Sequence, residues 1–207
     1  MWLLRWLLFR FMFMSGVVKL LSGDPNWWNL SALSYHFVSQ PLPTPLAWYA
    51  AHLPVALLRF ATGGMFVIEL GLPFLIFCPR RLRFLAAGGI LLLQGLILIT
   101  GNYNWFNLQT MLLCLLLFDD LALRRVVPRR LLARLTPPQT PGPPRTASRV
   151  VAVCGALIVF CSLVQMDARF DGSPPAVAQL VARGIEPLHI VSPYGLFAVM
   201  TTERPEI

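Results

Sequence analysis

Charged side chains inside otherwise apolar stretches are the residues of this sequence best placed to do chemistry. Arg10 and Lys19 lie in the first apolar stretch, and Glu69 lies in a later one. Each Arg or Lys costs roughly 2.5 to 3.5 kcal/mol at the centre of a membrane helix, so these charges need partners. If both stretches are helices, Arg10 and Glu69 lie at depths that differ by roughly 6 Å. We predict that they form a buried ion pair, either purely structural or part of a functional polar pocket.

Lys19 and Asp24 flank the end of the first apolar stretch. One interpretation is that Lys19 extends to the membrane interface while Asp24 caps a helix or turns the chain. The other is that Lys19 is desolvated and works as a catalytic base. The sequence contains no nucleophile–base motif, phosphate loop or dinucleotide fingerprint, so Lys19 is the candidate base if the protein is an enzyme.

Two segments rich in aromatic and polar side chains form a predicted outer face. The first, 24–52, contains no Lys or Arg, and the second, 101–107, reads GNYNWFN. Each is either an aromatic belt with tight turns or a recognition surface. The histidines lack metal-ligand spacing, so we expect no metal site. The candidate outer-face residues are Asp24, Trp27, Trp28, His36, His52, Asn102, Asn104, Trp105 and Asn107.

The composition is typical of a membrane protein. Hydrophobic residues make up 57% and charged residues 13% of the 207 residues, whereas about a quarter of a soluble domain is charged. The formal net charge is +8, but most arginines gather in 80–83 and 124–149, between apolar stretches. By the positive-inside rule these loops are cytoplasmic. We therefore expect the lipid bilayer, and no nucleic acid, as a partner.

These patterns predict an all-α polytopic membrane protein with about five transmembrane helices and a short extracytoplasmic α/β tail. Residues 1–123 are expected to form a four-helix transmembrane core, and 124–148 a cytoplasmic linker rich in Arg and Pro. The fifth helix is expected at 149–166, and the tail at 167–207, where we expect the chain to stop at the start of a β-rich domain. The predicted core helices are 2–21, 54–78, 84–100 and 105–123, and the predicted strands are 188–191 and 196–202.

The sequence resembles the lipase maturation factor family, and the resemblance extends in order over nearly the whole chain. The segments that carry it are WLLRWLLFRFMFMSGVVKLLSGDPNWW, YHFVSQPLPTP, FVIELGLPFLIF, LITGNYNWFNLQTMLLCLLLFDD and YGLFAVMTTERPEI. The resemblance implies a noncatalytic multi-pass protein that assists folding or assembly of secreted proteins such as lipases, with no cofactor. It implies the endoplasmic reticulum membrane in a eukaryote, and the inner membrane would be expected in a bacterium.

Two alternatives remain open. The segment from Gly16 to Leu20, followed by Asp24 and Trp27, is faintly similar to the vitamin K-dependent gamma-carboxylase and its bacterial relatives. That similarity implies a membrane enzyme that uses Lys19 as a base on a quinone-type or lipid-soluble cofactor. The second alternative is that the chain is a nonfunctional fragment of a longer family member.

Overall fold

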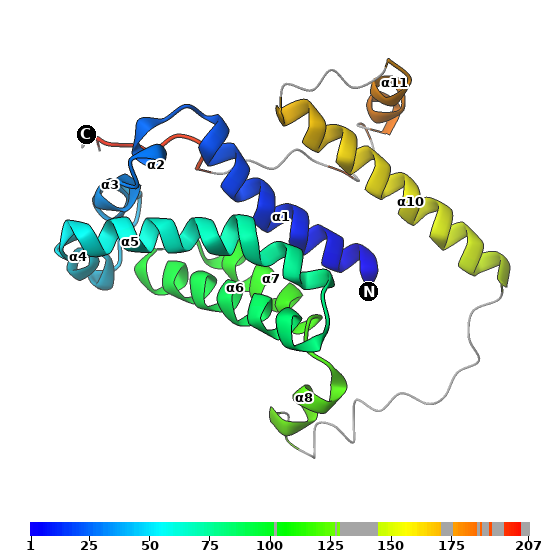
Figure 1. The fold of residues 1–207 in the computed structure, drawn as a ribbon, viewed down its shortest axis with the longest axis horizontal. Helices are drawn as coiled ribbons and strands as arrows, with labels where there is room; N and C mark the ends of the chain where they lie inside the picture. The colour runs from blue at the N-terminus through cyan, green and yellow to red at the C-terminus, as the bar shows by residue number, and fades with distance from the viewer. Residues whose placement is uncertain are drawn as a thin grey trace. The chain divides into compact units, whose positions relative to one another are not determined.

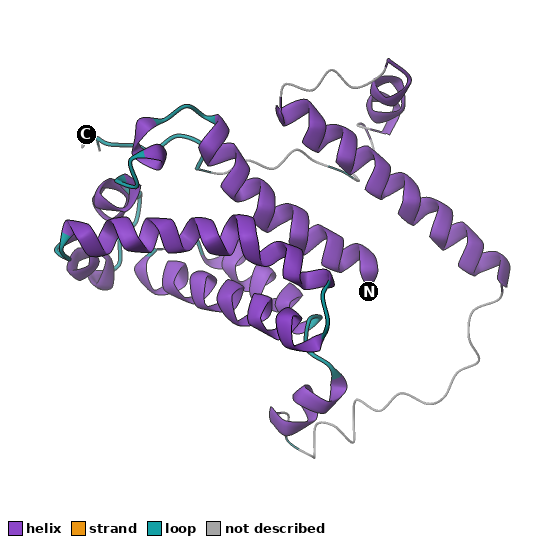
Figure 2. Cartoon of the chain, in the orientation of Figure 1, coloured by secondary structure: helices purple, strands orange, loops and turns teal. Residues whose placement is uncertain are grey.

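The chain divides into two units in the computed structural model. One unit is Met1–Leu117 with Tyr194–Ile207, and the other is Phe118–Pro193. The residues that the structure describes are 1–101, 103–126, 128, 145–170, 176–185, 187, 191 and 197–203. Within these residues the elements are helices joined by turns, with no strand (Figure 2).

The first unit begins with helix α1, Trp2–Leu21, whose bounds are those expected from the sequence. Ser22 caps the C-terminal end of the helix, and its backbone N–H donates to Val18 O. Gly23 follows at φ 73°, a left-handed conformation that glycine adopts without steric cost. The chain therefore turns sharply into the next helix.

Three short helices follow between α1 and the next apolar helix. They are α2 (Pro25–Trp28), α3 (Ala32–Ser39) and α4 (Pro45–Ala51). The loop before α4 is attached to the end of a later helix, α6 (Arg80–Thr100). Gln40 Nε2 donates to Thr100 O and Thr44 Oγ1 donates to Ile99 O, both at 2.8 Å. These bonds satisfy carbonyls that the end of a helix leaves without a partner.

The next apolar segment is helical throughout but is not a uniform α-helix. It consists of α5 (Val55–Phe66), a π-helical turn η1 (Val67–Gly71) and a 3-10 segment η2 (Leu72–Phe77). Pro73 explains the change, since in a regular α-helix its ring would collide with the carbonyl of Glu69, four residues earlier. The widened turn contains Glu69 itself.

Helices α6 and α7 complete the first unit. Helix α6, Arg80–Thr100, starts directly after Pro79, and α7 is Asn104–Leu115. In this bundle α6 contacts η2 and α7, and α1 contacts η1, η2 and α7 (Figure 1). Gly16 allows the close approach of α1 to η1, because a Cβ there would lie 2.6 Å from Leu70 Cδ2.

The predicted fourth helix, 105–123, is shorter in the structure and ends at Leu115. The carbonyls just beyond it are taken by arginine side chains from distant parts of the chain. Arg5 Nη2 donates to Leu116 O at 3.3 Å, and Arg83 Nε donates to Leu117 O at 2.7 Å. A new helix, α8 (Asp120–Val126), then begins in the second unit.

The second unit contains a long apolar helix. Helix α10, Arg145–Asp167, starts before and ends close to the predicted 149–166. A 3-10 turn (Ala168–Phe170) follows it, and then α11, Ala176–Ile185, contacts α10. Gln165 Nε2 donates to Val191 O at 3.1 Å within this unit.

Three helices among the described residues are long and apolar enough to cross a bilayer: Val55–Phe77, Arg80–Thr100 and Ser148–Phe170. The chain is therefore an all-α membrane protein. Helix α1 has 20 residues but carries three basic side chains, and the apolar part of α7, Trp105–Leu115, is short. Membrane crossing by these two helices stays a prediction.

The predicted second strand of the tail is absent. Residues 197–203 form a turn, bends and irregular backbone, while 188–190 and 192–196 lie outside the described residues. The physical reason is that side chains of the first unit bind this backbone. Trp27 donates to Ala198 O and Asp24 accepts from Met200 N–H, groups that a strand would use in a ladder.

Candidate functional site

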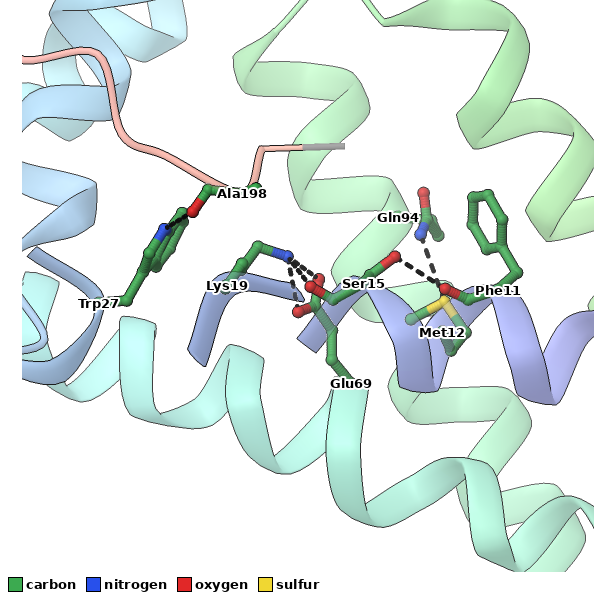
Figure 3. Close-up of polar contacts among 8 residues, drawn as sticks. All are labelled: Phe11, Met12, Ser15, Lys19, Trp27, Glu69, Gln94 and Ala198. Atoms are coloured by element: carbon green, nitrogen blue, oxygen red, sulfur yellow. Dashed lines mark hydrogen bonds and ion pairs between the residues drawn. The ribbon is translucent and has the colours of Figure 1, made fainter. Parts of the chain in front are cut away.

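The centre of the first unit is a buried ion pair between α1 and η1. Lys19 Nζ lies 2.8 Å from Glu69 Oε1 and 2.7 Å from Oε2, and it also donates to Ser15 O at 3.1 Å (Figure 3). Lys19 is 4% exposed and Glu69 5%. An ammonium group has three N–H donors, so these three acceptors satisfy it completely.

The local sequence explains how the pair comes together. Lys19 lies in the last turn of α1, and Gly16 on the same helix lets the two backbones approach. The π turn places Glu69 on the side that faces α1. The Trp27 ring lies 5.5 Å from Lys19 Nζ, which adds a cation–π contact.

The structure corrects the predicted Arg10–Glu69 pair, because the partner of Glu69 is Lys19. Arg10 is nine positions before Lys19, roughly 13.5 Å along the helix at about 1.5 Å per residue. The interpretation of Lys19 as a residue that extends to the membrane interface is also wrong, since its side chain is buried. The interpretation of Asp24 as a cap is confirmed: its side chain accepts from Asn26 N at the start of α2.

A second group of polar side chains connects α1, α6 and α7 inside the bundle. Asn107 Nδ2 donates to Gln94 O at 3.1 Å and to Gln94 Oε1 at 3.0 Å, and Gln94 Nε2 contacts Met12 Sδ at 3.8 Å. These side chains and the Lys19–Glu69 pair line a small cavity of about 80 Å³. Asn107, predicted at the outer face, is thus a buried link between α6 and α7.

Asp24 and Trp27 hold the segment 197–203 against the first unit. Asp24 Oδ2 accepts from Met200 N–H at 2.6 Å, and Trp27 Nε1 donates to Ala198 O at 3.0 Å (Figure 3 shows the Trp27 contact). The Met200 side chain packs in a small core with Trp27 and Ala32. Sequence patterns contain no signal for this docking, because the partners are more than 170 positions apart.

Hydrogen bonding determines the charge state of Asp24. Burial on its own would raise the pKa of this carboxyl. The hydrogen bonds from the Met200 N–H and from the backbone and side-chain amides of Asn26 outweigh burial, and the pKa lies below its usual value. Asp24 is therefore an anion when it binds the tail.

His36, Tyr103 and Phe197 form an aromatic cluster at the same docking site. Ring centroids are 6.3 Å apart for His36–Tyr103, 6.1 Å for His36–Phe197 and 5.1 Å for Tyr103–Phe197. Burial, and then the positive charge of Lys19, lowers the pKa of His36, while burial raises the pKa of Tyr103. Both side chains are thus uncharged at neutral pH.

The other predicted outer-face residues do not join this cluster. Trp28 and Trp105 are exposed, and the Trp28 indole donates to Leu20 O at 3.2 Å. His52 Nδ1 lies 2.7 Å from Trp48 O, and no group of metal-ligating side chains occurs among the residues that the structure describes. Asn102 and the side chain of Asn104 lie outside the described residues.

Comparison with known proteins gives the family. Residues 1–125, more than half of the chain, match the family model described as the lipase maturation factor transmembrane domain. The chain belongs to the lipase maturation factor family. Lipase maturation factor 2 of Homo sapiens is 58% identical over 120 residues, and that of Xenopus laevis 57% identical over 120 residues; each match covers 58% of this chain.

The matched relatives are longer than this chain. The matched part is 17% of each lipase maturation factor 2, and 38% of lipase maturation factor 1 of Mus musculus, which is 31% identical over 222 residues and covers the whole chain. No solved structure matches. The buried pair, Asp24 and Trp27 all fall in the family's transmembrane domain, and only the longer match reaches the docked segment 197–203.

Proposed function

We propose that this membrane protein assists the folding or assembly of an exported protein, such as a lipase, on the extracytoplasmic side. The observation that carries the proposal is the family match over 1–125, since the matched relatives bear the name lipase maturation factor. Because the chain spans only a small part of those relatives, the client and the activity are inferences.

The segment between α1 and α5 is the proposed client-facing surface. It has no Lys or Arg between Asp24 and His52, so the positive-inside rule favours the extracytoplasmic side for it. Trp28, Trp48 and Tyr49 are exposed on this segment. Exposed aromatic side chains of this kind are typical of surfaces that bind partly folded or apolar protein segments.

The same rule supports the sides proposed for the rest of the chain. The arginine-rich segments 80–83 and 124–149 would be cytoplasmic, and the C-terminal tail extracytoplasmic. The extracytoplasmic side corresponds to the endoplasmic reticulum lumen in a eukaryote and to the outer side of the inner membrane in a bacterium.

The carboxylase-like alternative receives no support from the ion pair. A lysine that works as a base needs an unprotonated amine with a free lone pair. Three acceptors, two of them oxygens of a carboxylate, instead surround the Lys19 nitrogen, so no position beside it is left for the proton of a substrate.

The proposal is tested by secretion of a dimeric lipase from cells that lack their own family members. Expression of this chain should raise secreted lipase activity, and the W48A/Y49A variant should lose most of that gain at equal protein level. F60A, which removes an exposed aromatic ring from α5, is the matched control. No gain with the unmodified chain, or equal gains with all three proteins, would contradict the proposal.

A further inference from the structure

The first unit contains a large cavity that the folding role does not use. Its volume is about 280 Å³, and α1, α3, α5, α6 and the docked segment all contribute to its wall. Lys19 and Glu69 line it, as do Trp27, His36 and Tyr103, while the remaining wall is mostly leucine and other apolar side chains.

The cavity has two unlike ends. Lys19, Trp27 and Glu69 are almost fully buried, whereas Leu53 is 42%, Leu57 47% and Leu96 49% exposed. Leu57 and Leu96 belong to Val55–Phe77 and Arg80–Thr100, two helices able to cross a bilayer. The apolar end therefore opens between these helices, where lipid chains would lie, and the polar end lies deep in the unit.

Hydrogen-bond capacity at the polar end selects the ligand's head group. All three donors of Lys19 are engaged, so the ammonium offers none to a ligand. Each oxygen of Glu69 accepts one bond from Lys19 and can accept another. A carboxylate or phosphate beside Glu69 would be repelled by its negative charge and would find no free donor on Lys19, while a hydroxyl group would find an anionic acceptor.

We propose that this cavity binds an uncharged lipid whose head group carries a hydroxyl, with the hydroxyl at Glu69 and the chain leaving between α5 and α6. The charged side chains of the wall are Lys19 and Glu69, which neutralise each other, so a neutral head group is matched. Burial keeps His36, which also faces the cavity, in its uncharged form.

Size agrees with a single chain. The cavity volume of about 280 Å³ lies just below the range of roughly 300 to 1,000 Å³ that is typical of small-molecule sites. The polar end and the first part of one acyl chain would fill it, and the rest of the chain would lie in the bilayer. A lipid with a bulky head group would not reach Glu69.

The test uses three photoreactive probes of equal chain length in vesicles that contain the full chain: a fatty alcohol, the fatty acid and the alkane. The alcohol should label peptides that contain Leu57 or Leu96 about tenfold more efficiently than either other probe, the ratio expected for one hydrogen bond to a charged acceptor. Equal labelling by the alkane, or stronger labelling by the acid, would overturn the proposal.

Two variants, one of them with a matched control, test the cavity and its polar end separately. A61W should fill the cavity and abolish labelling, whereas A56W, on the same helix but outside the cavity wall, should not. The double variant K19M/E69L removes the acceptor while replacing both charges, so the alcohol should lose its advantage over the alkane. Unchanged alcohol preference in K19M/E69L, or equal labelling of A61W and A56W, would refute the assignment. Lipase secretion is a separate readout, so either proposal can fail alone.

Discussion

Lys19 and Glu69 stabilise each other because neither charge can reach water. Removal of one member of a buried pair typically costs about 3 to 5 kcal/mol, since it leaves the other charge without a partner. Replacement of both by apolar side chains of similar size is often neutral. The two outcomes differ enough to identify the partner of Glu69.

We therefore expect E69L to destabilise the protein by about 3 to 5 kcal/mol and K19M/E69L to recover most of that loss. Thermal or denaturant unfolding in detergent measures both changes. R10M/E69L is the matched control. It removes Arg10, the cation that the sequence predicts to pair with Glu69 because the two residues lie at similar depths in their helices. Recovery in R10M/E69L rather than in K19M/E69L would contradict the observed pairing.

The pKa of His36 predicts a pH-dependent docking of 197–203. Because the docked pKa is below the exposed value of about 6.5, the undocked state takes up a proton first as the pH falls. The contribution of His36 to docking is therefore fully present above about pH 6.5 and is lost as the pH falls towards the lowered pKa. Asp24, whose pKa is lowered from its usual value of 3.8, stays ionised at the start of this loss just below pH 6.5 and does not contribute there.

Hydrogen exchange at the Met200 amide, which donates to Asp24, reports this docking. Its protection, corrected for the intrinsic pH dependence of exchange, should decrease on acidification below about pH 6.5. H36F keeps an aromatic ring but cannot titrate, so its protection should not change over the same range. An equal loss in H36F would assign the effect to another group.

At the scale of elements, close helix contacts depend on particular glycines. A Cβ at Gly16 would overlap Leu70, and it would also lie 3.2 Å from Glu69 Cβ, whereas a Cβ at Gly64 meets nothing within 4 Å. We expect G16A to destabilise the protein by about 1 to 3 kcal/mol through overpacking. G64A, in the interior of α5, should stabilise it by about 0.5 to 1 kcal/mol.

Unfolding of these two variants in parallel checks the prediction. Opposite signs are expected, since both exchanges add one methyl group to a helix and differ only in the space around it. If both variants gain stability, α1 and η1 are not packed as closely as the structure has them.

The elements show which parts of the fold follow from local sequence. The limits of α1 follow from an apolar run and the Ser22–Gly23 stop, which act locally. The end of α7 depends on Arg5 and Arg83, which bind the carbonyls of Leu116 and Leu117 from far along the chain. Such long-range bonds leave no mark in a hydrophobicity pattern.

Only part of the candidate site could be predicted from the sequence, because the rest also depends on contacts between distant residues. A buried cation opposite Glu69 follows from the cost of charge in an apolar helix. The choice of Lys19 over Arg10 does not, because it depends on the π turn before Pro73 and on the approach permitted at Gly16. The Asp24–Met200 contact requires the tail to return to the first unit, which residue spacing does not encode.

At the scale of the whole molecule, the proposed folding role depends on which segments face which side of the membrane. The segment 24–52 must be extracytoplasmic to meet a client, and the arginine-rich segment 124–149 must be cytoplasmic. The charge distribution favours this arrangement, since the first segment has no Lys or Arg and the second has many arginines.

The most direct measurement is the sidedness of two single reporter sites, one at Pro43 and one at Thr140, in the intact membrane. Modification by a membrane-impermeant reagent, or acceptor-site glycosylation in a eukaryotic host, reads each site separately. Our account predicts that Pro43 is extracytoplasmic and Thr140 cytoplasmic. The same compartment for both sites, or the reverse order, would contradict it.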